Sequence, residues 1–91
     1  MSVKSPTAFE EALAQLNDGH QEGDFNGRRW GATVHRSKDG RRVWLLAEQL
    51  GGREIVSFNL YRTNDSGSVL MPCEMSSEKV VEFVLHFRPD A

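Results

Sequence analysis

The sequence predicts an α+β fold in which a helix, a four-stranded antiparallel meander and a second helix follow one another. The segments 1–19 and 76–88 carry apolar residues at the three- and four-residue spacing of amphipathic helices. Between them, four stretches rich in β-branched and aromatic residues are separated by glycine-containing turns. We expect the 91 residues to form a single domain in which the helices cover one face of the sheet.

The N-terminal helix is indicated by one apolar face. Phe9, Leu13 and Leu16 recur at the spacing that brings side chains to the same side of a helix, and Gly19 can end it. The stretch that follows, 20–27, is polar and contains two glycines. We therefore predict a loop over 20–27.

The strands are predicted within 28–75 from three turns. Asp39-Gly40 and Gly51-Gly52 are typical of two-residue hairpin connections, and the sequence NDSG at 64–67 indicates a longer turn. Pro72 cannot donate to a ladder, so the fourth strand is expected to be an edge strand or to bulge there. The closing helix, 76–88, starts after a serine cap and ends before a proline.

The turns also predict which residues face each other. Pairing outward from the two short turns puts Val34 opposite Leu45, and Leu45 opposite Phe58. Closing the last turn with Thr63 opposite Ser68 puts Cys73 opposite Phe58. Three apolar rows then cross one face of the sheet, and this consistency favours the meander.

The opposite face is predicted to be partly apolar as well. His35 lies opposite Trp44, and Arg42 lies opposite Tyr61. A fully solvated face rarely collects so many large apolar side chains, so we expect another molecule to cover it. The residues assigned to this outer face are Arg29, Thr33, His35, Arg42, Trp44, Leu46, Glu48, Ile55, Ser57, Asn59, Tyr61, Leu70 and Glu74.

Charge is distributed unevenly along the chain. Residues 28–62 carry eight basic and three acidic residues, a net charge of +5, and the rest carries three basic and ten acidic ones, a net charge of −7. The whole chain has a formal charge of −2. A basic middle between acidic flanks can present one positive face, although a solvated strand surface has the same composition.

Two interpretations of the outer face remain open. Arginines interleaved with aromatic residues are typical of surfaces that bind single-stranded nucleic acid, and Trp, Tyr and Arg are also enriched at protein interfaces. The residues assigned to single-stranded DNA or RNA are Arg29, His35, Lys38, Arg41, Arg42, Trp44, Asn59 and Tyr61. The residues assigned to a homodimer interface are Leu46, Ile55 and Leu70.

The order of these signals also resembles a known fold. RRVWLLAEQLGGREIVSFNLYRT, SGSVLMP and SSEKVVEFV resemble the strands and the following helix of the positive-cofactor-four coactivators, whose fold is shared by the Whirly proteins and the Pur-alpha repeats. RRWGATVHRSKDGRRVWLLAE resembles the opening hairpin of a Pur-alpha repeat. The resemblance implies a sheet-and-helix homodimer that binds single-stranded nucleic acid. It implies that Trp44, Tyr61 and Trp30 stack on bases and that the arginines meet phosphates, although the register turns Trp30, Arg36 and Arg62 toward the helices.

Catalytic, metal and membrane chemistry have little support in the sequence. Cys73 is predicted to face the core, where a free cysteine acts as a small apolar residue, and the three histidines lack metal-ligand spacing. No apolar run is long enough to cross a bilayer, and the N-terminus has no apolar signal core. We expect a cytoplasmic, non-catalytic protein without a cofactor, whose single cysteine suits a reducing compartment.

Overall fold

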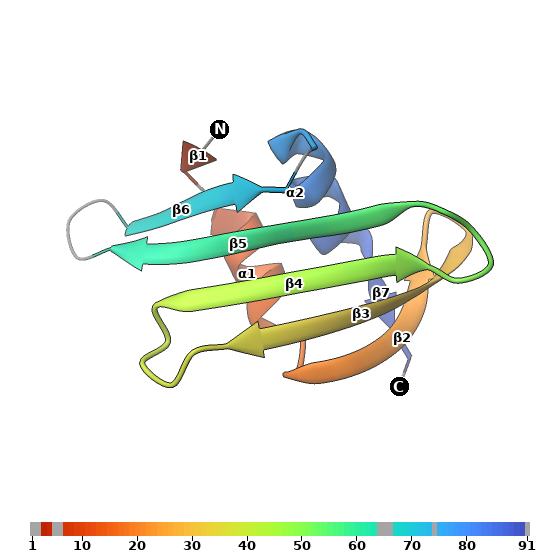
Figure 1. The fold of residues 1–91 in the computed structure, drawn as a ribbon, viewed down its shortest axis with the longest axis horizontal. Helices are drawn as coiled ribbons and strands as arrows, with labels where there is room; N and C mark the ends of the chain where they lie inside the picture. The colour runs from red at the N-terminus through yellow and green to blue at the C-terminus, as the bar shows by residue number, and fades with distance from the viewer. Residues whose placement is uncertain (1–2, 5–6, 64–66, 74, 91) are drawn as a thin grey trace.

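In the computed structural model, which describes residues 3–4, 7–63, 67–73 and 75–90, an antiparallel sheet carries two helices on one face (Figure 1). This confirms the α+β class. The longest predicted turn falls at 64–66, outside the described residues. The described elements are β1 (Val3–Lys4), α1 (Thr7–Ala14), β2 (Gly19–Phe25), β3 (Arg28–Arg36), β4 (Arg42–Gln49), β5 (Ile55–Thr63), β6 (Gly67–Pro72), α2 (Ser77–His86) and β7 (Arg88–Pro89).

The described part of the chain forms a sheet of seven strands in the order β1-β6-β5-β4-β3-β2-β7. Five consecutive strands, β2 to β6, form the meander, and two-residue strands from near the chain ends flank it. Every neighbouring pair is antiparallel. The sheet is therefore wider than the four predicted strands.

The predicted loop at 20–27 is wrong, because most of it is strand β2. Gly19 to Phe25 pair with β3 along their whole length. Asn26 and Gly27 form the two-residue connection, and both have positive φ, 55° and 77°. This is the backbone that an Asn-Gly hairpin turn requires. The stretch looked like a loop because β2 adds only one large apolar side chain, Phe25, which packs against the core.

The predicted register of β3, β4 and β5 is confirmed. Val34 lies opposite Leu45, which lies opposite Phe58 on the next strand. His35 lies opposite Trp44, and the register holds although the β3–β4 connection is longer than the predicted two residues. Ser37 N–H donates to the Arg42 carbonyl at 2.9 Å, so residues 38–41 form a four-residue loop.

The predicted register of β6 is wrong by one residue. Phe58 lies opposite Pro72, and Leu60 lies opposite Leu70. Because side chains alternate along a strand, the shift exchanges the two faces of β6. Leu70, predicted for the outer face and the dimer interface, is fully buried. Met71 takes its place on the outer face, 43% exposed.

The same shift moves Cys73 away from the core. Its N–H donates to the Ser57 carbonyl at 3.0 Å, and Ser57 is an outer-face residue. Its Sγ lies 4.0 Å from Asn59 Nδ2, and the residue is partly buried. This register buries Leu70 against Leu60 in the core and leaves Met71 and Cys73 on the other face.

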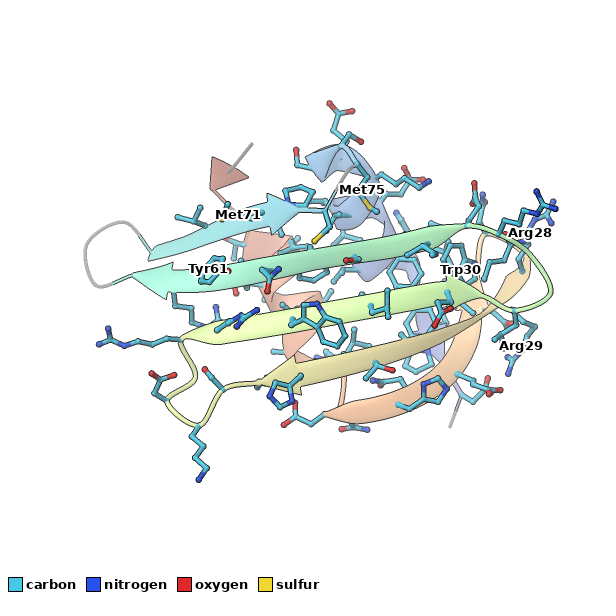
Figure 2. The ribbon with its side chains drawn as sticks, viewed as in Figure 1. Arg28, Arg29, Trp30, Tyr61, Met71 and Met75 are labelled. Atoms are coloured by element: carbon cyan, nitrogen blue, oxygen red, sulfur yellow. The ribbon has the colours of Figure 1, made fainter. Side chains whose placement is uncertain are left out.

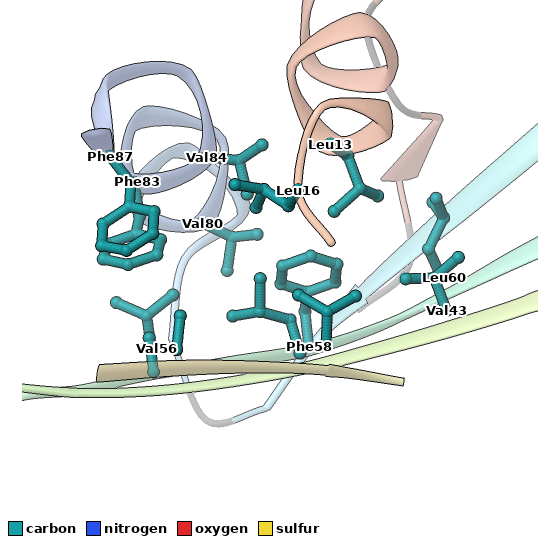
Figure 3. Packing of buried hydrophobic residues seen from close by; sticks show 14 of the residues in the cluster. Leu13, Leu16, Val43, Val56, Phe58, Leu60, Val80, Phe83, Val84 and Phe87 are labelled. Carbon is teal, nitrogen blue, oxygen red and sulfur yellow. The ribbon is translucent and has the colours of Figure 1, made fainter. Parts of the chain in front are cut away.

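The core lies between the inner face of the sheet and the two helices, as Figure 3 shows. Phe58 and Phe9 meet edge to face at 5.6 Å between ring centroids. Phe83 lies 5.1 Å from the Trp30 ring. Helix α2 begins with the Ser76 hydroxyl accepting from the Lys79 N–H, as predicted from its serine.

Two arginines join helix α1 to the sheet. Arg36 donates to the carbonyls of Leu13 and Leu16 at 2.9 and 3.0 Å, where the helix ends and its carbonyls lack partners in the helix. Arg62 donates to Glu10 at 2.8 Å. The prediction that Arg36 and Arg62 point toward the helix side is confirmed. Neither arginine therefore lies on the sheet face opposite the helices.

Candidate nucleic-acid interface

The outer face of the sheet, the side away from both helices, is open in the described structure, and Figure 2 looks onto it. The register arranges its side chains in rows that cross the strands. One row holds Arg42 and Tyr61; the next holds His35, Trp44, Asn59 and Met71. A third holds His20, Thr33, Leu46 and Ser57, and a fourth holds Glu22, Glu48 and Ile55.

The predicted nucleic-acid residues, except for Arg29, gather at one end of this face, which we call the basic end. His35, Arg42 and Trp44 line a pocket of about 220 Å³ together with Ser37. Lys38 and Arg41 lie in the adjoining loop, and Asn59 and Tyr61 lie on β5 beside Arg42. The basic end therefore contains His35, Lys38, Arg41, Arg42, Trp44, Asn59 and Tyr61.

The loop that carries Lys38 and Arg41 is shaped by Asp39. The Asp39 carboxylate accepts from the Ser37 hydroxyl at 2.7 Å and from the Arg41 N–H at 3.0 Å. The Arg41 backbone bond and then the Ser37 bond hold the pKa of Asp39 below its ordinary value. Gly40 follows with φ of +72°, which glycine adopts without strain. The loop is thus a defined turn at the edge of the pocket.

Arg42 is held flat against the outer face by two neighbours on β5. Its Nε and Nη2 donate to Asn59 Oδ1 at 3.1 and 2.9 Å. Its guanidinium carbon lies 5.9 Å from the centre of the Tyr61 ring. A guanidinium has five N–H donors, and these bonds use two of them. Three donors therefore stay available to a ligand, since the described structure gives them no acceptor.

Trp44 and Tyr61 offer two aromatic surfaces on neighbouring strands. Trp44 lies opposite Asn59, and Tyr61 is two residues further along β5. Such diagonal neighbours are about 7–8 Å apart in an antiparallel sheet. Tyr61 is 37% exposed. Trp30, the second tryptophan of the chain, is 1% exposed and belongs to the core. Trp30 is therefore not available for stacking, and Trp44 and Tyr61 are the aromatic side chains that the described part of the outer face presents.

Arg29 is separated from the other predicted site residues. It lies at the far end of the face, where its guanidinium contacts Asp90 at 2.7 and 2.9 Å, Asp24 at 3.1 Å and Glu22 at 3.7 Å. These contacts tie the C-terminal residues to strand β3. Three carboxylates compete with any phosphate for this guanidinium, so we leave Arg29 out of the interface.

The ion pair between Arg29 and Asp90 has an expected pH dependence. The hydrogen bond from Arg29 lowers the pKa of Asp90 below its usual 3.8. A lowered pKa in the folded state stabilises the fold at neutral pH, and this stabilisation disappears as the pH falls through the lowered value. We expect Asp90→Asn to unfold at lower urea concentration than the wild type at pH 7, and we expect this difference to shrink as the pH is lowered below 3.8. A difference that stays constant with pH would contradict this.

Other possible sites in the described residues are weaker. A second pocket of about 360 Å³ lies between the β2–β3 turn and the end of α2, lined by Phe25, Asn26, Glu82, His86 and Arg88. No group of three His, Cys, Asp or Glu side chains in the described part is placed to hold a metal ion. None of its helices is long and apolar enough to span a membrane.

Sequence reasoning missed His20 and Glu22 on β2 and Met71 and Cys73 on β6 as members of the outer face. The Asn26-Gly27 turn indicates the first pair, and pairing Thr63 with Gly67 would have indicated the second. No known protein family, curated protein or solved structure matches this chain. The described residues form a small α+β protein with an open, partly aromatic sheet face.

Proposed function

We propose that this chain is a non-catalytic binding module that holds single-stranded DNA or RNA on the basic end of its outer face. One observation carries the proposal: Trp44 lines an open pocket with His35 and Arg42 on a sheet face that no other element of the described chain covers. Exposed aromatic rings beside cationic groups are the recurring surface of proteins that bind single strands. The resemblance to the Whirly-type fold points to the same class of ligand.

The two kinds of side chain have separate roles in this proposal. Bases stack on Trp44 and Tyr61, and each such stack contributes about 1–3 kcal/mol. Arg42 lies by the Tyr61 ring and lines the pocket with Trp44, and its three available donors meet the phosphate that joins the stacked nucleotides. Lys38 and Arg41 extend the positive surface along the loop. A duplex hides its base faces, so the proposal is specific for single strands.

The module works in the cytoplasm, where the thiol of Cys73 stays reduced. Neither a cofactor nor a metal enters the proposed binding, because stacking and charge account for it.

A second candidate function is a protein-interaction module whose outer face binds only protein. Ile55 and Met71 favour it, since they are 48% and 43% exposed on the same face and offer nothing to a phosphate. The two functions differ in their salt dependence. Binding to nucleic acid weakens steeply with salt because counterions are released, whereas an apolar protein contact does not weaken in this way.

The test is a fluorescence titration with a mixed-sequence single-stranded oligonucleotide. Stacking on Trp44 is expected to quench its emission, while buried Trp30 keeps its own. If Lys38, Arg41 and Arg42 each neutralise one phosphate, the plot of log affinity against log salt has a slope of about −2. Trp44→Phe is the control, because the remaining signal comes from Trp30 and should not change. No quenching at low salt, or equal quenching in Trp44→Phe, contradicts the proposal.

A further inference from the structure

Charge on the outer face changes sign along the strands. The basic end carries Arg42, with Lys38 in the loop beside it, and both side chains are exposed. Three rows away, the opposite end carries Glu48 and Glu22, also exposed. Arg29 lies beside Glu22, together with Asp24 and Asp90, so carboxylates predominate there and we call it the acidic end. The apolar side chains Trp44 and Leu46 lie between the two ends on β4, and Tyr61 and Ile55 lie beside the ends on β5. A surface of this kind has complementary ends within one molecule.

Two copies of such a face can stack on each other in two symmetric ways. A two-fold axis between the stacked sheets runs either along the strands or across them. An axis along the strands puts the basic end of one copy over the basic end of the other. An axis across the strands reverses the direction, so that each basic end lies over an acidic end. Repulsion disfavours the first arrangement, and attraction favours the second.

The second arrangement also matches the side chains of β4. When the axis crosses β4 at the level of Leu45, Arg42 of each copy lies over Glu48 of the other. Trp44 then lies over Leu46 of the other copy. Both pairs form twice, because an isologous contact repeats itself. The outward residues of this central strand are therefore matched in charge or in apolar character.

The same two-fold axis, which was placed from β4 alone, also brings compatible side chains of β5 together. Tyr61 shares a row with Arg42, and Ile55 shares a row with Glu48. Tyr61 therefore lies over Ile55 of the other copy, which gives partners to two exposed apolar side chains. Asn59 lies over Ser57 of the other copy, and both have polar groups that can form hydrogen bonds.

The size of the face suits a stable pair. The described residues extend 40 × 25 × 19 Å, and the sheet is seen broadside when the molecule is viewed along the shortest dimension (Figure 1). A typical protein interface buries about 800 Å² of each partner. An outline of 40 × 25 Å leaves room for such an area.

We propose that a second copy of this chain covers the outer face of the free protein, in antiparallel orientation, and that nucleic acid competes with this copy. The pairing buries Arg42, Trp44 and Tyr61, so a molecule in the pair cannot stack bases on them. The competition rests on the proposed function, whereas the pairing itself does not. Self-association then regulates the site, because only separated copies bind the strand.

The experiment is a charge exchange followed by analytical ultracentrifugation. Arg42→Glu and Glu48→Arg each create like-charge contacts in the antiparallel pair, and each is expected to weaken dimerisation at least about 10-fold. The double variant restores opposite charges and is expected to dimerise within a few-fold of the wild type. Glu82→Arg makes the same change as Glu48→Arg on the exposed side of α2 and is the matched control. A wild-type monomer, or a double variant no better than the single ones, overturns the inference.

An oligonucleotide titration of the same variants separates the inference from the proposed function. Glu48→Arg is expected to bind single-stranded oligonucleotide at least as tightly as the wild type, since its face is uncovered and more positive. The double variant is expected to dimerise and to bind poorly. If dimerisation responds to the charge exchange but no variant binds oligonucleotide, the proposed function is wrong and the inferred pairing still holds. A wild-type monomer that binds oligonucleotide contradicts the pairing and leaves the function.

Discussion

Replacing Leu70 with alanine is expected to lower the free energy of unfolding by about 2–5 kcal/mol. Leu70 is fully buried, and it lies opposite Leu60 within the core. Removing its branched end leaves a cavity among residues that are themselves buried and cannot fully close around it. Urea denaturation followed by circular dichroism measures the change, and a lower midpoint with an unchanged slope is the expected result.

The neighbouring residue provides the control for this prediction. Met71 is 43% exposed on the other face of the same strand, so Met71→Ala is expected to change the free energy of unfolding by about 0.5 kcal/mol or less. The two variants together test the register of β6. The opposite order, a large effect at Met71 and a small one at Leu70, would support the register first predicted from the turn.

Replacing Trp44 with alanine is expected to weaken binding of a single-stranded oligonucleotide about 5- to 150-fold, which corresponds to one lost base stack of 1–3 kcal/mol. Trp44 is the larger of the two rings at the basic end, and it lines the pocket beside Arg42. Fluorescence anisotropy of a labelled oligonucleotide measures the loss without using the protein's own emission.

Two controls make the Trp44 result interpretable. Trp44→Phe keeps an aromatic ring and is expected to recover most of the affinity. Trp44→Leu lacks the ring and is expected not to recover it, whereas equal affinities of the two variants would mean that only the size of the side chain matters. Leu85→Ala removes an exposed apolar side chain from helix α2, away from the outer face, and is expected to leave affinity unchanged. Equal binding by Trp44→Ala and the wild type would remove the basis of the proposed function.

Much of the sheet was predictable because its turns constrain it. Asp39-Gly40 and Gly51-Gly52 fixed which residues of β3, β4 and β5 face each other, and the alternation of apolar residues agreed with them. When a turn and an apolar pattern give the same register, a slip by one residue would move a whole apolar row into water. The register of these three strands was therefore predictable from the sequence.

The two wrong assignments occur where one of these constraints was missing or unused. Strand β2 has few apolar residues, and its Asn26-Gly27 turn was the usable signal. Strand β6 follows a turn with no two-residue signal, and it has apolar residues at consecutive positions, Val69 to Met71, so the pattern accepts either register. Only the packing of Leu70 in three dimensions decides between them.

The placement of the candidate site residues was predictable where it depends on strand register, and their long-range contacts were not. Trp44, Arg42 and Tyr61 came together as expected, because they lie on β4 and β5. Arg29 was assigned to the site from its charge and its place on the outer face. Its main partner, Asp90, is 61 residues away in sequence, and no local pattern reveals that β7 brings it back beside β2.

The short strands at the two borders of the sheet have a consequence for how the protein behaves when concentrated. Exposed sheet borders with free backbone groups are templates for open-ended stacking into fibrils. Here β1 pairs with β6, and β7 pairs with β2 at Gly23 and Asp24. A β-carbon on Gly23 would come within 2.2 Å of the Arg88 carbonyl oxygen, so the C-terminal strand lies tight against that border. We therefore expect crowding to produce closed assemblies of limited size rather than insoluble aggregates.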